Sequence, residues 1–297
     1  MRFKTWMVEI RVPYLYLPIV LTAVGSILAF YDGHFSLLPC LVFTAVLVLL
    51  HISVNTLNDY YDDRTKIDHN TNRTAFNGGT GILQEGLLRP GEVMRTALLC
   101  FVIAALLSAY LVITVSWSLL LIVIPGMLFA LFYTQFFVRN MLGEIAAGLG
   151  LGGLPVLGAY LVQIQAIPLP LVLLAVSSSL LTFDLLLLNE FPDESADRLG
   201  GRRNLILRFG KRRSAWIYGV NTLMVYAILL GGIVLGMFPA LTVVGLLTLP
   251  LAYKAVSGAF KGDEPLGHFF NAQRANIQVV LLTQVLFVIG FAAAMII

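Results

Sequence analysis

The sequence has few charged residues and almost no cysteine. Of its 297 residues, 12% are Asp, Glu, Lys or Arg, whereas 59% are hydrophobic. A soluble domain needs more polar residues than this to cover its water-facing surface, so the composition excludes an ordinary soluble protein. The two cysteines, Cys40 and Cys100, both lie in apolar runs. The sequence therefore predicts neither a disulfide framework nor a zinc site.

Long apolar runs occupy most of the chain. A helix of about 20 apolar residues spans a bilayer, and nine runs approach that length. They cover residues 13–30, 37–57, 96–115, 118–138, 142–162, 168–188, 215–237, 241–253 and 278–297, the eighth being short and interrupted by Pro250. The sequence predicts an all-α, polytopic membrane helix bundle of about nine transmembrane helices, forming a single domain over residues 1–297. We expect the first run to be a retained helix, because Glu9 and Arg11 precede it.

The basic residues predict the orientation of this bundle. With a cytoplasmic N-terminus, the cytoplasmic segments are 1–12, 58–95, 139–141, 189–214 and 254–277, and together they contain all 19 Lys and Arg residues. Basic residues favour the cytoplasmic side of membrane proteins, so the net charge of +3 reflects topology and predicts no nucleic-acid partner. We expect a multi-pass protein of a bacterial or archaeal plasma membrane. Its active site should face the cytoplasm, because the long polar loops lie on that side.

Two of the polar segments contain a weak internal repeat. The residues Asn55, Asp59, Asp63 and Arg64 recur at the same spacing as Asn189, Asp193, Asp197 and Arg198. Each set begins where an apolar run ends. A duplicated helical unit that faces its copy across a central cavity would explain the pattern. The expected halves cover about residues 13–138 and 142–297.

The repeated segments place acidic and amide side chains at helical spacing. A spacing of four residues returns to nearly the same helix face, so Asn55, Asp59 and Asp63 should share one face, and their three counterparts a second. Neighbouring carboxylates repel one another unless a cation lies between them, and Mg²⁺ suits hard oxygen ligands together with substrate phosphates. The alternative is that these acids solvate helix ends, as we expect of Glu9. The predicted metal ligands are Asp59, Asp62, Asp63, Asp193 and Asp197, and all of them except Asp63 are also predicted to be catalytic.

Basic and amide residues near both acidic segments complete a predicted diphosphate site. A departing diphosphate needs cationic neighbours in addition to metal, although positive-inside placement alone would also explain basic residues here. The residues predicted to bind the diphosphate are Asn55, Asn58, Arg64, Lys66, Asp68, Arg73, Arg139, Asn189, Arg198 and Arg202. The glycine-rich stretch 77–81 either approaches a phosphate or caps the cavity with its backbone, or it forms a plain turn. Residues 211–213 are expected to contact lipid headgroups.

Three polar side chains within the apolar runs indicate a second binding region. Glu144 and Asp184 lie inside an apolar run or at its mouth, and ionisable groups within a membrane are costly and usually functional. His51 lies one turn before Asn55 on the same face. It either lines an acceptor pocket or is a hydrogen-bonded structural histidine.

These motifs resemble those of the UbiA superfamily of intramembrane prenyltransferases, and within it the branch of 1,4-dihydroxy-2-naphthoate polyprenyltransferases. The resemblance extends from the second predicted helix to the seventh. It is carried by Asn55-x-x-Asn58-Asp59-Tyr60-Tyr61-Asp62, by Asn189-Glu190-Phe191-Pro192-Asp193-x-x-x-Asp197-Arg198, by Gly201-Arg202-Arg203-Asn204-Leu205, and by Tyr133-Thr134 with Leu142-Gly143-Glu144. With Tyr133 from this middle section, the predicted acceptor-binding residues are His51, Tyr133, Glu144 and Asp184.

The resemblance implies Mg²⁺-dependent transfer of a polyprenyl group from polyprenyl diphosphate to an aromatic acceptor. In this branch the acceptor is 1,4-dihydroxy-2-naphthoate, in menaquinone biosynthesis, and the prenyl tail stays in membrane lipid. Lys66 stands where many members have the third acid of the first motif, which leaves Asp63 or Asp68 to supply that oxygen. The alternatives are a related enzyme that uses 4-hydroxybenzoate, a chlorophyllide, haem or a glycerol phosphate lipid, and, as a non-enzyme, an ion-coupled membrane transporter.

Overall fold

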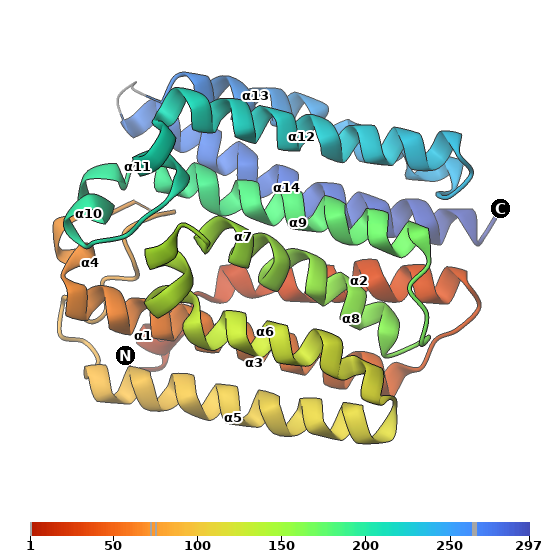
Figure 1. Ribbon diagram of the computed structural model, residues 1–297, viewed down its shortest axis with the longest axis horizontal. Coiled ribbons are helices and arrows are strands. Elements are labelled where there is room, and N and C mark those ends of the chain that lie inside the picture. Colours follow the sequence, from red (N-terminus) through yellow and green to blue (C-terminus); the bar gives the residue numbers. More distant parts are fainter. Residues whose placement is uncertain (1, 72, 75, 263–265) are drawn as a thin grey trace.

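The computed structural model describes residues 2–71, 73–74, 76–262 and 266–297 of the chain. Within these ranges all regular elements are helices, and nine spans are long and apolar enough to cross a membrane (Figure 1). The predicted all-α class and the number of transmembrane helices are confirmed for this part of the chain. The spans are Val12–Tyr31, Leu37–Thr65, Pro90–Thr114, Trp117–Asn140, Gly143–Leu161, Leu169–Glu190, Lys211–Val234, Ala240–Phe260 and Phe269–Ala294.

Each span is helical because lipid offers no partner for backbone N–H and C=O groups, which must then be satisfied within the segment. The elements of the first half are α1 Arg2–Glu9, η1 Val12–Leu15, α2 Tyr16–Tyr31, α3 Leu37–Thr65, α4 Ile67–Asn70, α5 Pro90–Thr114, η2 Trp117–Leu119, α6 Leu120–Phe132, η3 Tyr133–Phe137 and η4 Val138–Asn140. Those of the second half are α7 Gly143–Gly148, η5 Leu149–Gly153, α8 Leu154–Leu161, α9 Leu169–Glu190, α10 Glu194–Leu199, α11 Leu205–Phe209, α12 Lys211–Val234, η6 Ala240–Thr248, α13 Leu249–Phe260 and α14 Leu266–Ala294.

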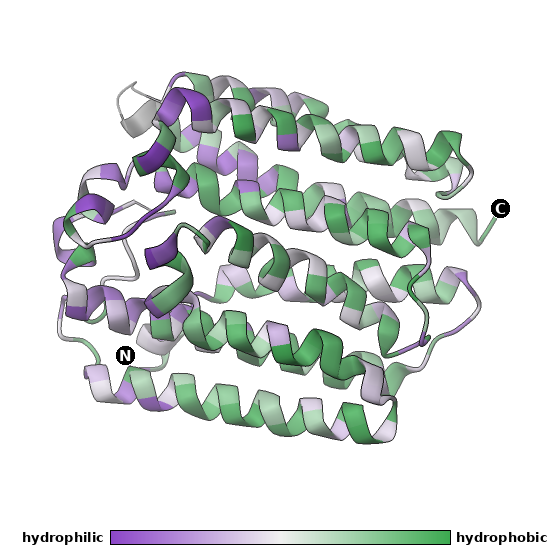
Figure 2. Cartoon of the chain, in the orientation of Figure 1, coloured by the Kyte–Doolittle hydropathy of each residue, from purple (hydrophilic) through white to green (hydrophobic). Residues whose placement is uncertain are grey.

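The two ends of the bundle differ in polarity. Figure 2 shows hydrophilic residues gathered at the end where α4, α10 and α11 lie, whereas the helix shafts are mostly hydrophobic. We call this the polar end. Both acidic motifs belong to it, because α3 and α9 each run toward it and are followed there by the short helices α4 and α10.

Several helices extend beyond their apolar runs. The prediction ended the second run at residue 57, but α3 continues to Thr65, and α14 begins at Leu266, not at residue 278. The predicted polar loop 254–277 is therefore largely helical in its described part, which corrects that expectation. Apolar run length reports the bilayer thickness, whereas a helix ends only where its backbone hydrogen bonding stops. The eighth span changes just before Pro250 from the 3₁₀ helix η6 to the α-helix α13, and Pro250 stands in the first turn of α13, where no donated N–H is needed.

The second acidic motif does not lie on one helix, contrary to the prediction. Asn189 is in the last turn of α9, which ends at Glu190, and Asp193 directly precedes α10. Pro192 lies between the two helices, and proline cannot donate the backbone hydrogen bond that a continuous helix needs. Asn189, Asp193 and Asp197 therefore occupy a helix, a turn and a second helix. The first motif is as predicted, because residues 55–63 all belong to α3.

Small residues allow the central helices to approach closely. A Cβ atom on Gly25 of α2 would lie 2.3 Å from the backbone oxygen of Val156 in α8. Glycine interfaces of this kind are common between membrane helices, where close backbone packing replaces the hydrophobic effect. The contact anchors α2 against α8, and α2 in turn carries the N-terminal segment that reaches the polar end.

Candidate active site

A cavity of about 630 Å³ opens at the polar end between the two acidic motifs. Both motifs, the loop before α5 and the N-terminal segment contribute side chains to it. Its lining includes seven of the residues predicted for the metal and diphosphate site, namely Asn58, Asp62, Asp68, Arg73, Asn189, Asp193 and Arg202. The structure therefore brings together two segments that are far apart in the sequence.

Arg202 joins the two motifs directly. Its guanidinium donates to Oδ2 of Asp62, in the first motif, and to Oδ1 of Asp197, in the second, at 3.3 Å. Asn204 donates to the other oxygen of Asp197 at 2.8 Å. Asp62 and Asp197 are both buried, and carboxylates so placed need a cation between them. In this structure the guanidinium of Arg202 is that cation.

A second ion pair ties the N-terminal segment to the site. Arg11 adopts a left-handed backbone conformation, with φ of 53°, between α1 and η1, and its guanidinium pairs with Oδ1 of buried Asp59. The backbone N–H of Thr80 donates to the other oxygen of Asp59 at 3.3 Å, and the Thr80 hydroxyl donates to Glu9 at 2.9 Å. The expectation that Glu9 merely solvates a helix end is wrong, because its side chain is fully buried. Burial, and then repulsion by Asp59, raise the pKa of Glu9 to about 7.

The loop that contains residues 77–81 forms one wall of the cavity. Asn77 donates to Oδ1 of Asp193 at 2.5 Å. Gly79 has φ of +68°, and a Cβ atom there would lie 2.1 Å from Oδ2 of Asp68. Only glycine fits against this carboxylate, because any other residue would clash with it and would also strain the backbone. The stretch is therefore more than a plain turn, since it lines the cavity and contacts acids of both motifs.

The donor set fits a hard divalent cation. One oxygen of Asp62, one of Asp68 and one of Glu190 are buried without a hydrogen-bond partner. Burial, and then repulsion by Asp62 and Asp59, raise the pKa of Asp68 to about 7. Burial also raises the pKa of Asp193 to about 7 against the hydrogen bond from Asn77, which lowers it. A cation bound between these carboxylates would stabilise their ionised forms and so lower the raised pKa values.

No three His, Cys, Asp or Glu side chains in the described ranges already converge as a closed metal cage. This arrangement is compatible with Mg²⁺, which keeps several waters and is usually bound through one or two carboxylates plus substrate phosphates. Two arginines explain why the described side chains form no closed cage, because Arg11 and Arg202 occupy carboxylate oxygens that such a cage would need.

Several predicted site residues lie outside this cavity. The side chain of Asp63 bonds to His69 at 3.0 Å and accepts from Gln84 at 3.3 Å. Arg64 contacts the Tyr60 hydroxyl at 3.1 Å, and Arg198 contacts Glu194 at 3.3 Å. Four basic residues predicted to bind the diphosphate have exposed side chains and do not line the cavity, namely Arg64, Lys66, Arg139 and Arg198. Of the two acids left open for the first motif, only Asp68 lines the cavity.

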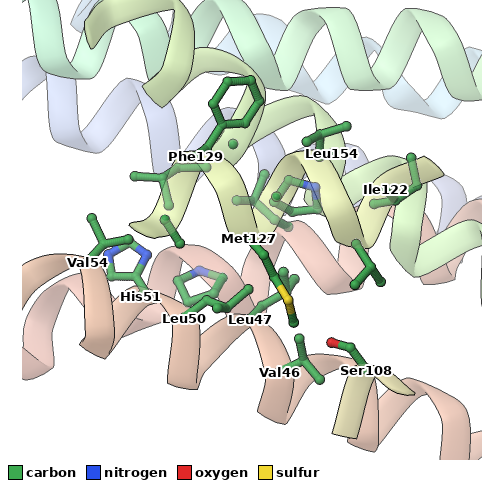
Figure 3. A pocket seen from close by; sticks show the side chains of 18 of the residues that line it. Val46, Leu47, Leu50, His51, Val54, Ser108, Ile122, Met127, Phe129 and Leu154 are labelled. Atoms are coloured by element: carbon green, nitrogen blue, oxygen red, sulfur yellow. The ribbon is translucent and has the colours of Figure 1, made fainter. Parts of the chain in front are cut away.

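The predicted acceptor residues divide into two groups. His51 and Tyr133 line a pocket between α3, α5, α6 and the α7–α8 span, which we call the apolar pocket (Figure 3). Glu144 instead accepts the backbone N–H of Leu205 at 2.7 Å, at the start of α11. Asp184 accepts hydrogen bonds from Asn221 at 2.9 Å and Thr222 at 3.2 Å. Neither Glu144 nor Asp184 lines the apolar pocket or the polar cavity.

The apolar pocket is lined mostly by hydrocarbon, and its polar side chains are those of His51, Ser108 and Tyr133. The His51 ring makes no hydrogen bond in the described part of the chain, and the buried Ser108 hydroxyl has no partner. Figure 3 shows both side chains among Val46, Leu50 and Met127. His51 and Asn58 are two turns apart on α3, roughly 10 Å, and Asn58 donates to Thr134 beside Tyr133 at 3.2 Å. The pocket therefore lies next to the polar cavity, on its membrane side.

A third, smaller cavity extends the polar site toward lipid. It has a volume of about 210 Å³ and lies between the start of the first span, α9 and α14. Its lining includes Leu17, Leu185 and Val280, and it shares Pro13, Tyr14 and Phe76 with the polar cavity. We call it the side groove. A molecule with a charged head and an apolar tail could occupy both cavities at once.

Sequence reasoning named the stretch 77–81 but not the partner of Asn77, and it missed two residues that the structure places at the site, Glu9 and Arg11. No motif marks them, because Arg11 and Glu9 resemble the ordinary charged flank of a membrane helix. The one signal in the sequence is the closeness of an acid and a base just before the first apolar run. Asn77 stands next to two glycines in the loop, which indicates a turn but not its partner.

Comparison with known proteins reveals one matching family. The model of the UbiA prenyltransferase family matches residues 19–277. The 1,4-dihydroxy-2-naphthoate octaprenyltransferase of Bacillus subtilis (strain 168) is 26% identical over 256 residues, covering 84% of this chain and 79% of that protein. The enzyme of the same name from Escherichia coli (strain K12) is 27% identical over 310 residues, covering 97% and 95%. UbiA prenyltransferase domain-containing protein 1 of Homo sapiens is 30% identical over 238 residues, covering 78% and 68%.

Solved structures share the fold. The apo structure of a UbiA homolog from Aeropyrum pernix K1 superimposes with a TM-score of 0.71 at 19% identity, covering 96% of this chain and 97% of that one. The UbiA homolog from Archaeoglobus fulgidus bound to GPP and Mg²⁺ superimposes with a TM-score of 0.61 at 13% identity, covering 99% and 100%. At these identities the likeness concerns the arrangement of helices.

Proposed function

The chain belongs to the UbiA prenyltransferase family, and from this premise we propose that it transfers a polyprenyl group from polyprenyl diphosphate to 1,4-dihydroxy-2-naphthoate, with Mg²⁺ as cofactor. The observation that carries the proposal is the convergence of both acidic motifs on one cavity, joined by Arg202. The acceptor is supported by the names of the bacterial relatives. The donor and the metal are supported by the Archaeoglobus fulgidus homolog bound to GPP and Mg²⁺.

The polar cavity suits the diphosphate head of the donor. Asp62, Asp68 and Asp193 line this cavity and are available to hold Mg²⁺ there, and the first two have an unpartnered buried oxygen. Asp59 and Asp197 do not line it but pair with Arg11 and Arg202, which do. When bound, Mg²⁺ acts as a Lewis acid that neutralises charge on the departing diphosphate. Arg11 and Arg202 would exchange carboxylate contacts for diphosphate oxygens, which guanidinium groups bind well in a forked geometry. Arg73, on the cavity wall, adds a third cation.

The side groove suits the tail of the same donor. Its walls are apolar and it joins the polar cavity at Pro13, Tyr14 and Phe76. A polyprenyl chain leaving the cavity by this route would stay in contact with hydrocarbon along its length. This route avoids exposing the apolar surface of the polyprenyl chain to water, which costs about 25 cal/mol per Å². It also explains why the reaction site lies at the end of a membrane helix bundle.

The apolar pocket suits the aromatic acceptor. Carbon–oxygen cleavage in the donor produces diphosphate and an allylic cation, and the electron-rich ring then forms the new carbon–carbon bond. For 1,4-dihydroxy-2-naphthoate the carboxylate carbon leaves as carbon dioxide, which returns the ring to aromaticity. The apolar walls exclude water that would otherwise capture the cation. His51 would accept a hydrogen bond from a ring hydroxyl, because its imidazole otherwise lacks a partner among the described residues.

A membrane-fraction assay tests this function. Labelled polyprenyl diphosphate is supplied with Mg²⁺ or EDTA and with a panel of acceptors that includes 1,4-dihydroxy-2-naphthoate and 4-hydroxybenzoate. We expect Mg²⁺-dependent transfer to the naphthoate, abolished by EDTA and reduced at least about 100-fold by Asp62→Asn and by Asp193→Asn. Transfer to another acceptor would keep the reaction and replace the acceptor. Absence of metal-dependent transfer to any acceptor, with folded protein, would refute the proposal.

A further inference from the structure

A separate cavity of about 1030 Å³ lies between α13 and α14, away from the site described above. Its lining shares no residue with the polar cavity, the side groove or the apolar pocket. Three basic side chains line it, those of Lys254, Lys261 and Arg274, and no acidic residue does so within the described ranges. Ser257, Asn271 and Gln278 add uncharged polar groups. The cavity therefore concentrates positive charge in one place.

The position of the cations makes this cavity unusual for a membrane helix pair. Lys254 and Arg274 are exposed, and each belongs to a membrane span. Lys254 stands six residues before the end of α13, roughly 9 Å along its axis, and Arg274 is five residues inside the last span, roughly 8 Å. Both lie near the polar end, because α13 ends there and α14 begins there. At this depth a bilayer changes from headgroups to acyl chains.

Neither Lys254 nor Arg274 forms an ion pair with a carboxylate in the described part of the chain. A charged group that faces lipid within a span is costly unless it reaches the interface or meets an opposite charge. Here two such groups from different helices face one cavity, and Lys261 lies further along α13 on its rim. An anion in the cavity would relieve the cost for Lys254 and Arg274 together.

The same helices offer an apolar surface for a tail. Leu251 and Phe269 line the cavity beside the basic groups, and small residues, Gly258 and Ala272, form its floor. A Cβ atom on Gly258 would lie 2.3 Å from that of Ala272, so α13 and α14 are in close contact beneath the cavity. An anionic lipid would match both features, with a headgroup for the cations and an acyl chain for the apolar residues.

We propose that the α13–α14 cavity is a binding site for the phosphate headgroup of an anionic phospholipid, with Lys254 and Arg274 as its main ligands. Phosphate accepts charge-assisted hydrogen bonds from both cation types, and Ser257 and Asn271 complete a polar shell. Tyr253, exposed beside Lys254 on α13, has the amphipathic ring typical of the membrane interface. The site is independent of the proposed reaction and requires no diphosphate or acceptor.

Lipid titration of the delipidated full-length protein in detergent tests the proposal. Binding of dioleoyl-phosphatidylglycerol, dioleoyl-phosphatidylcholine and inorganic phosphate is followed by native mass spectrometry and by the shift in thermal unfolding. We expect saturable binding of the anionic phosphatidylglycerol, weaker binding of the zwitterionic phosphatidylcholine, and little effect of phosphate alone. The double variant Lys254→Gln/Arg274→Gln should bind the anionic lipid roughly tenfold more weakly, since each interfacial cation contributes substantially to anionic lipid binding.

The matched control removes the same charge elsewhere. Lys4→Gln/Arg95→Gln replaces two exposed cations, on α1 and α5, that line none of the cavities, and it should leave the affinity within about twofold. A second variant, Ser257→Asp, places an acid in the cavity without removing a cation and should also weaken binding. Equal affinity for the two lipids, equal loss in the control, or an equal shift with free phosphate would overturn the proposal.

Discussion

Individual carboxylates at the polar end differ in their surroundings, and the differences separate the candidate metal ligands from acids that only make protein contacts. Asp68 is buried, lines the polar cavity and has an unpartnered oxygen. Asp63, five residues earlier, points toward His69 and Gln84 outside the cavity. Both residues fit the same place in the motif by sequence, since Lys66 stands where a third acid is expected. The structure favours Asp68.

Replacement of these two acids should therefore have unequal effects. We expect Asp68→Asn to lower kcat/KM for prenyl transfer by about 100-fold, a magnitude typical of removing one charge-stabilising group from an active site. Asp63→Asn should lower it less than about threefold. Steady-state assays at several Mg²⁺ concentrations compare the two variants, and a larger loss for Asp63→Asn would reverse the assignment.

Asp184 provides a second test at the residue scale. It was expected to bind the acceptor, yet its carboxylate accepts hydrogen bonds from Asn221 and Thr222 and lines neither candidate cavity. Asp184→Leu leaves two buried donors without partners, at about 1–3 kcal/mol each, so we expect a lower unfolding temperature in detergent. Asp184→Asn, which keeps one acceptor, should lose less. An increased KM for the acceptor at unchanged stability would instead restore the acceptor role.

Whole helices are positioned by residues that carry no chemistry. The first span brings Arg11 to the polar cavity, and its own place depends on the contact between Gly25 and the backbone of α8. Because the nearest atom is backbone, a neighbouring rotamer cannot relieve the clash that a Cβ would create.

Gly25→Ala should therefore destabilise the bundle, by about 2 kcal/mol as is usual for overpacking. Gly231→Ala, in the last turn of α12, is the matched control, since a Cβ there meets nothing within 4 Å. We expect that control to unfold at the wild-type temperature or slightly above it. Thermal unfolding in one detergent compares the two variants, and equal temperatures would contradict the packing argument.

Short helices decide how the second motif differs from the first. α3 continues unbroken through residues 55–63, whereas the chain after α9 turns at Pro192 before α10 begins. The turn directs Asp193 toward Asn77 and leaves Asp197 beside Arg202. The sequence repeat is therefore not a repeat of local structure at this point, and the relation between the two halves stays a prediction.

For the molecule as a whole, the orientation in the membrane also stays a prediction. The polar end, with all of the described candidate metal ligands, should face the cytoplasm because basic residues gather in the segments on that side. The opposite end exposes short connections such as the one between α2 and α3, which contains His34.

Cysteine labelling in intact bacterial cells tests this orientation. In a chain with Cys40 and Cys100 replaced by Ala, His34→Cys and Ser118→Cys should react with a membrane-impermeant maleimide, because both belong to the far end. Asn70→Cys, an exposed residue of α4, should react only after the cells are permeabilised. The opposite pattern would place the active site outside the cell.

The sequence alone was sufficient for the class of the protein, the number of its candidate membrane spans and the two acidic segments that the candidate site contains. Apolar runs report bilayer thickness directly, and the acids occur in dense, patterned segments, so both properties are local in the chain. Even the family was recognisable from these segments. What the sequence left undetermined were the ends of the helices and the break at Pro192, which depend on backbone hydrogen bonding beyond the apolar run.

Only the tertiary structure decided which charges meet. Arg202 lies between Asp62 and Asp197, Arg11 pairs with Asp59, and Asn77 contacts Asp193, although most of these partners are far apart in the sequence. The same folding kept Asp184 and Glu144 away from the cavities and brought Lys254 and Arg274 to a common one. Such pairings depend on how whole helices pack, and helical spacing within one segment carries no information about the segment that will face it.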